Sequence, residues 1–154
     1  MRVYFLDSSA LVKRYISEIG STWVLGLFEP ALNHEILVAA VTGVEIVAAI
    51  TRRARGGSIS TLDATTVSNQ FKNDWLTEYQ VVEITENIIN SGMRLAELHG
   101  LRGYDAIQLA AGIAINQLCL ANSLLPVIFV SADKELNTAA SNEGLIVENP
   151  NNYP

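Results

Sequence analysis

Short apolar runs alternate along the whole chain with longer stretches of helical spacing. The runs are rich in Val, Ile, Leu and Phe and predict buried strands at 3–6, 36–41, 81–84, 127–130 and 145–148. Between them, apolar residues recur at three- and four-residue intervals, which predicts helices. These expected helices cover 8–15, 21–28, 42–55, 60 toward 75, 85–99, an apolar stretch from 105, and 133–143.

No turn typical of a β-hairpin separates the runs, so strands and helices alternate. This pattern indicates an α/β fold with a central parallel sheet, right-handed crossovers and helices on both faces. We expect a single domain over residues 1–149, followed by a polar C-terminal tail at 150–154, because 154 residues suffice for one core. No repeat, low-complexity block or linker interrupts this order.

The uncharged segment 106–132 is the one membrane-like feature. Polar residues and Pro126 interrupt it, so we expect a buried helix leading into a buried strand instead of a membrane span. No signal-peptide pattern precedes Asp7, and the single Cys119 lies in an apolar stretch, which is typical of a buried thiol. We therefore expect a cytoplasmic protein without an internal disulfide.

The net charge of −6 limits the ways in which this chain can bind nucleic acid. A protein that holds nucleic acid by phosphate neutralisation alone is normally basic. A nucleic-acid role would need a local basic patch together with a metal ion. The hydrophobic content of 49% is high, which suggests that a partner covers part of the surface.

Four acidic residues stand where a parallel sheet would bring them to one edge. Asp7 directly follows the first strand, and Glu45 lies one turn into the helix after the second. Asp105 opens the apolar helix, and Asp133 comes two residues after the fourth strand. Ligands of such sheets bind outside the carboxyl ends of the strands, where the strand order reverses. All four side chains are therefore candidates for one site.

Helix capping explains each acid better than catalysis does when the acid is taken alone. Asp is a favoured N-cap, and Thr42 with Glu45 fits a capping box. However, the helices near Ser21, Ser60 and Thr85 open with hydroxyl residues, whereas the converging starts carry acids. Taken as a set, the acids favour a common site.

Carboxylates that lie close together in a low dielectric either take up protons or recruit a cation. A ligand set of oxygens, with no His or Cys nearby, suits Mg²⁺ or Mn²⁺ and argues against zinc. The hydroxyls of Ser8, Ser9 and Ser131 could orient the carboxylates or bound waters. Such an ion can activate water and stabilise charge on phosphorus oxygens, so the chemistry that fits is phosphodiester hydrolysis.

The segments around these acids resemble a known family. The matching segments, in chain order, are Phe5–Tyr15, Glu45–Arg52, Gly103–Ala111 and Val130–Leu136. Together they resemble PIN domains, especially the VapC toxin nucleases of VapBC toxin–antitoxin pairs. The similarity covers nearly the whole chain in the expected order.

The resemblance implies a PIN-like three-layer α/β/α sandwich and Mg²⁺- or Mn²⁺-dependent cleavage of RNA. It also implies a homodimer and neutralisation by a small cognate antitoxin, although the family includes members that serve in RNA processing. Among the acids, it makes Asp7 and Asp105 direct metal ligands and Asp133 a ligand through water. Glu45 would be a ligand or would position the attacking water. Ser9 and Ser131 match hydroxyl positions beside the site.

Basic residues near the acids are candidates for holding the RNA backbone. This set comprises Arg52, Arg102, Lys134, Lys13 and Arg14. Arg52 lies seven residues past Glu45, roughly 10 Å along a helix, which suits a neighbouring phosphate. Tyr104 could stack on a base, although packing is the favoured interpretation. His34 and His99 lack metal-ligand spacing and predict surface or helix-end roles.

Two other functions remain open at this point. One is a catalytically silent PIN-like module whose acidic pocket receives a basic partner segment. The other is a phosphoacceptor receiver domain, which also places Asp residues at strand ends. A receiver domain expects an adjacent acidic pair after the first strand, whereas Ser8 and Ser9 follow Asp7 here.

Overall fold

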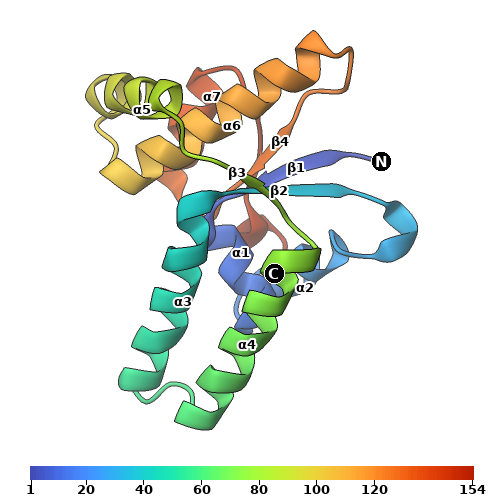
Figure 1. Cartoon of the computed structure of the whole chain (residues 1–154), viewed down its shortest axis with the longest axis vertical. Helices are drawn as coiled ribbons and strands as arrows, with labels where there is room; N and C mark the ends of the chain where they lie inside the picture. Colours follow the sequence, from blue (N-terminus) through green and yellow to red (C-terminus); the bar gives the residue numbers. More distant parts are fainter.

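A five-stranded parallel sheet forms the middle layer of the structure, a computed structural model that describes residues 1–154 (Figure 1). The strands are β1 (Val3–Leu6), β2 (Glu35–Ala39), β3 (Gln80–Val82), β4 (Ile128–Val130) and β5 (Ile146–Glu148). Their order across the sheet is β3-β2-β1-β4-β5, with every pair parallel. The predicted α/β class and parallel sheet are confirmed.

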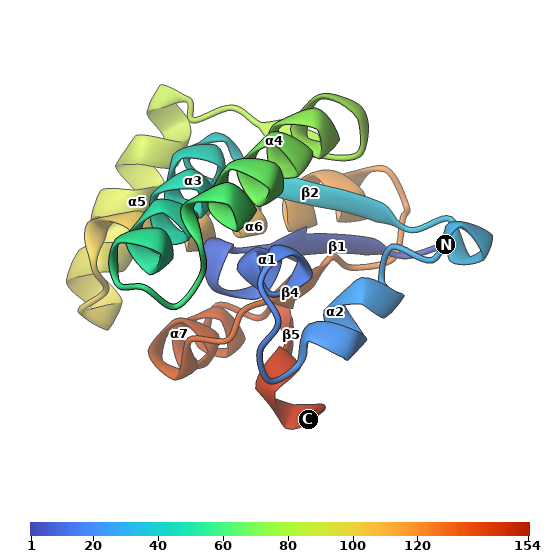
Figure 2. The same cartoon turned by 90° about the horizontal axis from the view of Figure 1, so that it is seen from below.

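Helices cover both faces of this sheet (Figures 1 and 2). One face carries α1 (Ser8–Tyr15), α2 (Ser21–Gly26), α3 (Ala40–Arg55) and α4 (Thr61–Thr77). The other carries α5 (Glu86–His99), α6 (Gly103–Ala121) and α7 (Lys134–Asn142). Two short 3₁₀ helices, η1 (Pro30–Leu32) and η2 (Pro150–Asn152), complete the chain. The three-layer α/β/α sandwich is confirmed.

Each face of the sheet has its own core. Phe5 packs with residues of α5, α6 and α7, whereas its neighbour Leu6 packs with residues of α1 to α4. Successive side chains of a strand point to opposite faces, so a strand covered on both sides needs an unbroken apolar run. This explains why the strands were recognisable as continuous hydrophobic stretches.

The sheet topology also defines where a ligand would bind. After β1 the chain moves outward through β2 to β3, and it then returns to place β4 on the other side of β1. The strand order therefore reverses between β1 and β4, whose carboxyl ends lead into Asp7 and Asp133.

The start of α3 differs from the prediction. The second strand was expected to continue to Val41, but β2 ends at Ala39 and α3 begins at Ala40. Its N-cap residue, Ala39, makes no side-chain capping hydrogen bond. Thr42 consequently lies inside the helix, and the interpretation of Thr42 and Glu45 as a capping box was wrong.

The C-terminal residues pack on α2 and do not extend as a tail. Pro150 is buried in η2, which follows β5 close to α2 (Figure 2), and the ring of Tyr153 stacks on Trp23 with 4.8 Å between ring centroids. Gly20, which caps α2 with a φ of 85°, has no room for a side chain against the Pro150 carbonyl. Cys119 is buried, as predicted, and none of the helices is long and apolar enough to cross a membrane.

Candidate active site

Asp7 is a buried carboxylate held by three donors at the carboxyl end of β1. It is the N-cap of α1, and its Oδ1 accepts hydrogen bonds from the Ala10 amide at 2.9 Å and the Ser9 hydroxyl at 2.7 Å. The Ser131 hydroxyl donates to its Oδ2 at 2.6 Å. Burial raises the pKa of Asp7 to about 6, although the hydrogen bonds oppose this shift, and the nearby Asp105 adds to it. Ionised Asp7 is therefore in an unfavourable place without a cation.

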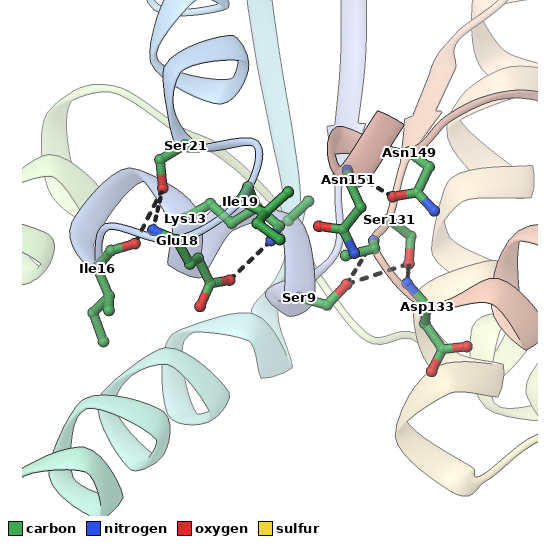
Figure 3. A network of polar contacts seen from close by, with 12 residues as sticks. Ser9, Lys13, Ile16, Glu18, Ile19, Ser21, Ser131, Asp133, Asn149 and Asn151 are labelled. Atoms are coloured by element: carbon green, nitrogen blue, oxygen red, sulfur yellow. Dashed lines mark hydrogen bonds and ion pairs between the residues drawn. The ribbon is translucent and has the colours of Figure 1, made fainter. Parts of the chain in front are cut away.

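Ser9 and Ser131 join the ends of β1 and β4 around this carboxylate. Their hydroxyl oxygens lie 3.3 Å apart, and Ser9 Oγ accepts from the Ala132 amide at 2.9 Å. Ser131 Oγ accepts from the Asp133 amide at 3.1 Å, as Figure 3 shows. The two hydroxyls thus lie where the sequence predicted them, and they fix the orientation of Asp7.

Asp133 also serves as a helix cap. Its Oδ1 accepts a hydrogen bond from the Leu136 amide at 3.0 Å at the start of α7. Capping therefore accounts for Asp7 and Asp133 in structural terms. It leaves the second Asp133 oxygen without a protein donor.

Capping does not account for Asp105. This residue is the third of α6, whose N-cap is Arg102, and its half-buried carboxylate accepts no hydrogen bond from the protein. Burial raises the pKa of Asp105, and repulsion from Asp133 raises it further. Arg102 opposes this effect, while Glu45 and Glu135 add to it. Asp105 therefore lies close enough to Asp133, Glu45 and Glu135 to be affected by their charges.

Glu45 is held between two other elements. The Ser8 hydroxyl of α1 donates to its Oε2 at 3.0 Å, and the Gln108 amide of α6 donates to its Oε1 at 2.9 Å. The four predicted acids therefore gather from α1, α3, α6 and α7 at the carboxyl edge of the sheet.

The acids only partly meet the geometry that a metal ion requires. Their chemistry suits Mg²⁺ or Mn²⁺, since all donors are oxygens, and unpartnered Asp105 and buried Asp7 would both gain from a cation. However, no group of three or more His, Cys, Asp or Glu side chains is arranged so that it could hold a metal ion. The carboxylates thus converge without surrounding a single point.

A cleft of about 460 Å³ opens beside the acidic edge. Its walls come from α1, α3 and the first turn of α6, and they are mostly apolar. Its polar members are Ser8, Ser9, Glu45, Arg52 and Tyr104. Because Glu45 lies both in this wall and in the acidic group, the cleft gives access to the site.

Comparison with known proteins shows similarity to VapC ribonucleases. The chain is 26% identical over 145 residues to Ribonuclease VapC45 and to Ribonuclease VapC49, both of Mycobacterium tuberculosis. The match covers 94% of this chain and 93% of each relative. No protein-family model matches the sequence.

Several solved structures have the same architecture. VapBC2 from Rickettsia felis, solved with a promoter DNA fragment, aligns with a TM-score of 0.63 at 16% identity over 96% of this chain and 98% of that one. FitAcB from Neisseria gonorrhoeae also gives 0.63, at 13% identity over 96% and 97%. The chain has the fold of VapC-type PIN domains.

Three of the predicted RNA-contacting residues are exposed in this PIN fold. Arg52, Arg102 and Lys134 form no ion pair with any side chain, which leaves their charges free for a ligand. Tyr104 is 64% exposed and lies on the wall of the cleft, so the favoured packing interpretation was wrong.

The expectation for Lys13 has to be corrected. Its side chain is 5% exposed, and its ammonium donates to Glu18 at 3.0 Å and to the Ile19 carbonyl at 2.7 Å. Figure 3 shows this pair as a group of its own, apart from Ser9. Lys13 holds the turn between α1 and α2 and has no free charge for RNA.

Arg14 is likewise committed to the protein interior. Its guanidinium lies 3.9 Å from the centre of the Phe28 ring and pairs with Glu78 at 2.6 Å. It also donates to Tyr79 at 2.7 Å. Lys13 and Arg14 both lie on α1, which the sequence predicted. The sequence did not reveal which side chains would pair with their charges.

One residue of the site, Gln108, was missed as a functional candidate. Gln108 is 1% exposed and donates to Thr42 Oγ1 and Glu45 Oε1, each at 2.9 Å. The available signal was spacing, because Gln108 follows Asp105 by three residues and therefore lies on the same side of a largely apolar helix.

Proposed function

We propose that this protein is a Mg²⁺- or Mn²⁺-dependent endoribonuclease that hydrolyses RNA phosphodiester bonds. The observation that carries the proposal is Asp105, a half-buried carboxylate that accepts no hydrogen bond from the protein and that other acids repel. Burial and repulsion both disfavour its charged form, whereas a nuclease uses such a carboxylate to bind a cation. The similarity to VapC ribonucleases over 94% of the chain supports the same activity.

The four acids would have different roles at the metal site, according to their surroundings. Asp7 and Asp105 would be direct ligands, and Asp133 would act through water with the oxygen that does not cap α7. Bound Mg²⁺ would lower the pKa of a water molecule and neutralise charge on the phosphate oxygens. Glu45, which lines the cleft, would be a further ligand or would orient the attacking water.

The exposed cations would hold the RNA around the scissile bond. Arg52 lies in the wall of the cleft, and Arg102 lies near enough to Asp105 to oppose the rise of its pKa. Lys134 follows Asp133 directly. Tyr104, exposed at the cleft, offers a ring on which a base can stack.

We further propose that the protein is the toxin of a type II toxin–antitoxin pair. The fold is shared with VapBC2 of Rickettsia felis and with a toxin–antitoxin complex from Klebsiella pneumoniae. A small cognate antitoxin would then neutralise this chain, and the chain itself would form a homodimer. Co-expression with the neighbouring gene product, followed by purification of one component, tests the pairing.

A metal-dependent RNA cleavage assay on Asp105→Asn tests the activity. This substitution removes the charge without breaking a hydrogen bond, so the fold should be kept. Asp63→Asn is the matched control, because Asp63 is also the third residue of its helix but is exposed in α4. Cleavage should fall at least about 100-fold in Asp105→Asn, as expected when an interaction worth several kcal/mol is lost, and should be unchanged in Asp63→Asn.

Two results would contradict the proposal. One is equal cleavage by wild type and Asp105→Asn, and the other is wild-type cleavage that persists in EDTA. Both the comparison of variants and the EDTA test should use single-stranded RNA, once with Mg²⁺ and once with Mn²⁺.

One observation favours a second candidate, a silent PIN-like module that receives a basic segment of a partner. No three acids are arranged around one point for a metal ion. In that case the wild-type chain would bind a basic peptide at the acidic edge but would cleave no RNA with any divalent ion.

A further inference from the structure

Gln108 connects the two helices that carry Glu45 and Asp105. Its Nε2 lies 2.9 Å from Thr42 Oγ1 and 2.9 Å from Glu45 Oε1, so both amide hydrogens are used. Thr42 and Glu45 are three residues apart on α3, and Asp105 and Gln108 are three residues apart on α6. Each pair therefore lies on one side of its helix, and the two pairs face each other.

The charge of Glu45 determines the orientation of the Gln108 amide. If the amide were flipped, its oxygen would lie against a carboxylate oxygen, which is repulsive. In the favourable orientation the Gln108 Oε1 is buried and has no hydrogen-bond partner. The protein therefore keeps a buried carbonyl unpaired in order to place an N–H donor at Glu45.

Packing alone gives no reason for this amide. Gln108 is 1% exposed, and the next residues of α6, Leu109, Ala110 and Ala111, are all buried apolar side chains. An apolar side chain of the same size would fill the position without an unpaired carbonyl. Glu45 would not be left unpaired either, because the Ser8 hydroxyl still donates to its Oε2.

We propose that Gln108 is a positioning residue that fixes the Glu45 carboxylate for catalysis, with Thr42 orienting its amide. Ser8 holds one oxygen of Glu45 and Gln108 holds the other, so the plane of the carboxylate is set by two different helices. A carboxylate oxygen can accept two hydrogen bonds, so each oxygen still has a free site toward the cleft. The proposal rests on the proposed nuclease function and assigns it a residue outside the acidic quartet.

The first test is Gln108→Met, which keeps the size of the side chain and removes the donor. We expect kcat for RNA cleavage to fall about 10- to 100-fold, as for other groups that orient a metal-site side chain. KM should stay the same, and the melting temperature should change little, because the unpaired Gln108 carbonyl is removed while the buried Thr42 hydroxyl loses its donor. Gln70→Met is the matched control, because Gln70 donates a single hydrogen bond to Asp74 in α4, away from the site. It should leave kcat unchanged.

A double-mutant cycle shows whether Gln108 acts through Glu45. If it does, Gln108→Met should have little further effect on kcat in a Glu45→Gln protein, since residues that act as a unit are not additive. Crystal structures of wild type and Gln108→Met should show a changed Glu45 rotamer. Thr42→Val, which replaces the hydroxyl with a methyl group, should give a smaller loss of kcat and keeps the test usable if Gln108→Met does not fold.

The outcomes separate this inference from the proposed function. If wild type cleaves RNA but the two losses add, or if Glu45 does not move, the positioning role is wrong and the nuclease assignment stands. If wild type cleaves no RNA and binds no Mn²⁺ by calorimetry, both are wrong.

Discussion

Asp7 and Asp105 illustrate how differently two acids of one site can be held. Asp7 caps α1 and accepts three hydrogen bonds, whereas Asp105 accepts none from the protein. Asp7 is almost fully buried, and burial costs its charged form more than the hydrogen bonds return, so its pKa rises to about 6. Because the pKa of Asp7 is higher in the folded protein than in the unfolded chain, the stability of the metal-free protein depends on pH.

We predict that the metal-free protein loses stability as pH rises through 6. Folded Asp7 binds its proton more tightly than the unfolded chain, in which the pKa is near 3.8, so protonation stabilises the fold. This contribution is fully present below pH 4 and is lost above about 6, and it amounts to about 3 kcal/mol. Urea unfolding of wild type and Asp7→Asn between pH 4 and 7 measures it as the difference between the two curves.

The Asp7→Asn protein should have the flatter profile and should be the more stable of the two at pH 7. Saturating Mg²⁺ should restore the stability that the wild-type protein loses at that pH. Parallel profiles for the two proteins would show that Asp7 ionises normally.

Helix α6 carries both Asp105 and Gln108, so its distance from the sheet controls the geometry of the site. Gly112, two turns after Asp105, lies directly over Phe129. A Cβ at this position would be 2.7 Å from the Phe129 ring. That ring cannot easily move, because it stacks on Phe5 with 5.6 Å between centroids. The glycine therefore permits a close approach of helix and sheet.

We predict that Gly112→Ala destabilises the protein by about 1 to 3 kcal/mol through overpacking. This loss should exceed the gain of about 1 kcal/mol that alanine normally brings to a helix. Gly26→Ala in α2 is the control, because a Cβ there meets no atom within 4 Å. Urea unfolding should show a loss only for Gly112→Ala, and equal stability of the two variants would contradict the close approach.

At the scale of the whole molecule, the excess of negative charge restricts how RNA can be held. The net charge is −6, and two of the five predicted RNA-contacting cations, Lys13 and Arg14, are already paired inside the protein. Only Arg52, Arg102 and Lys134 remain free near the site. Binding should therefore depend on few phosphate contacts and show a weak dependence on salt.

We predict a slope of about −2 for log K against log[salt] when the protein binds single-stranded RNA, from about −0.7 for each of three contacts. Fluorescence anisotropy with the Asp105→Asn protein measures this slope without cleavage. Arg52→Ala, Arg102→Ala and Lys134→Ala should each make it shallower by about 0.7. Lys13→Met should leave the slope unchanged and lower the melting temperature, because Lys13 pairs with Glu18; a shallower slope for Lys13→Met would contradict its structural role.

The sequence by itself determined the order of elements, the parallel sheet and the positions of the four acids. These depend on local patterns: an apolar run marks a strand covered on both faces, Asp7 directly follows such a run, and Asp133 follows another after Ser131 and Ala132. The helix from Ser8 to Tyr15 also has the predicted bounds, because its start after Asp7 and its helical spacing are local features of the sequence. Even the edge at which the acids meet follows from alternating strands and helices.

Only the tertiary structure decided what each polar side chain contacts. Gln108 and Glu45 are 63 residues apart in the chain, and no periodic pattern links them before α3 and α6 pack on opposite faces of the sheet. Likewise, Arg14 of α1 pairs with Glu78 at the end of α4 only because these two helices pack together. A local pattern tells which face of a helix is buried, but the partner of a buried charge or amide is chosen by the packing of distant segments.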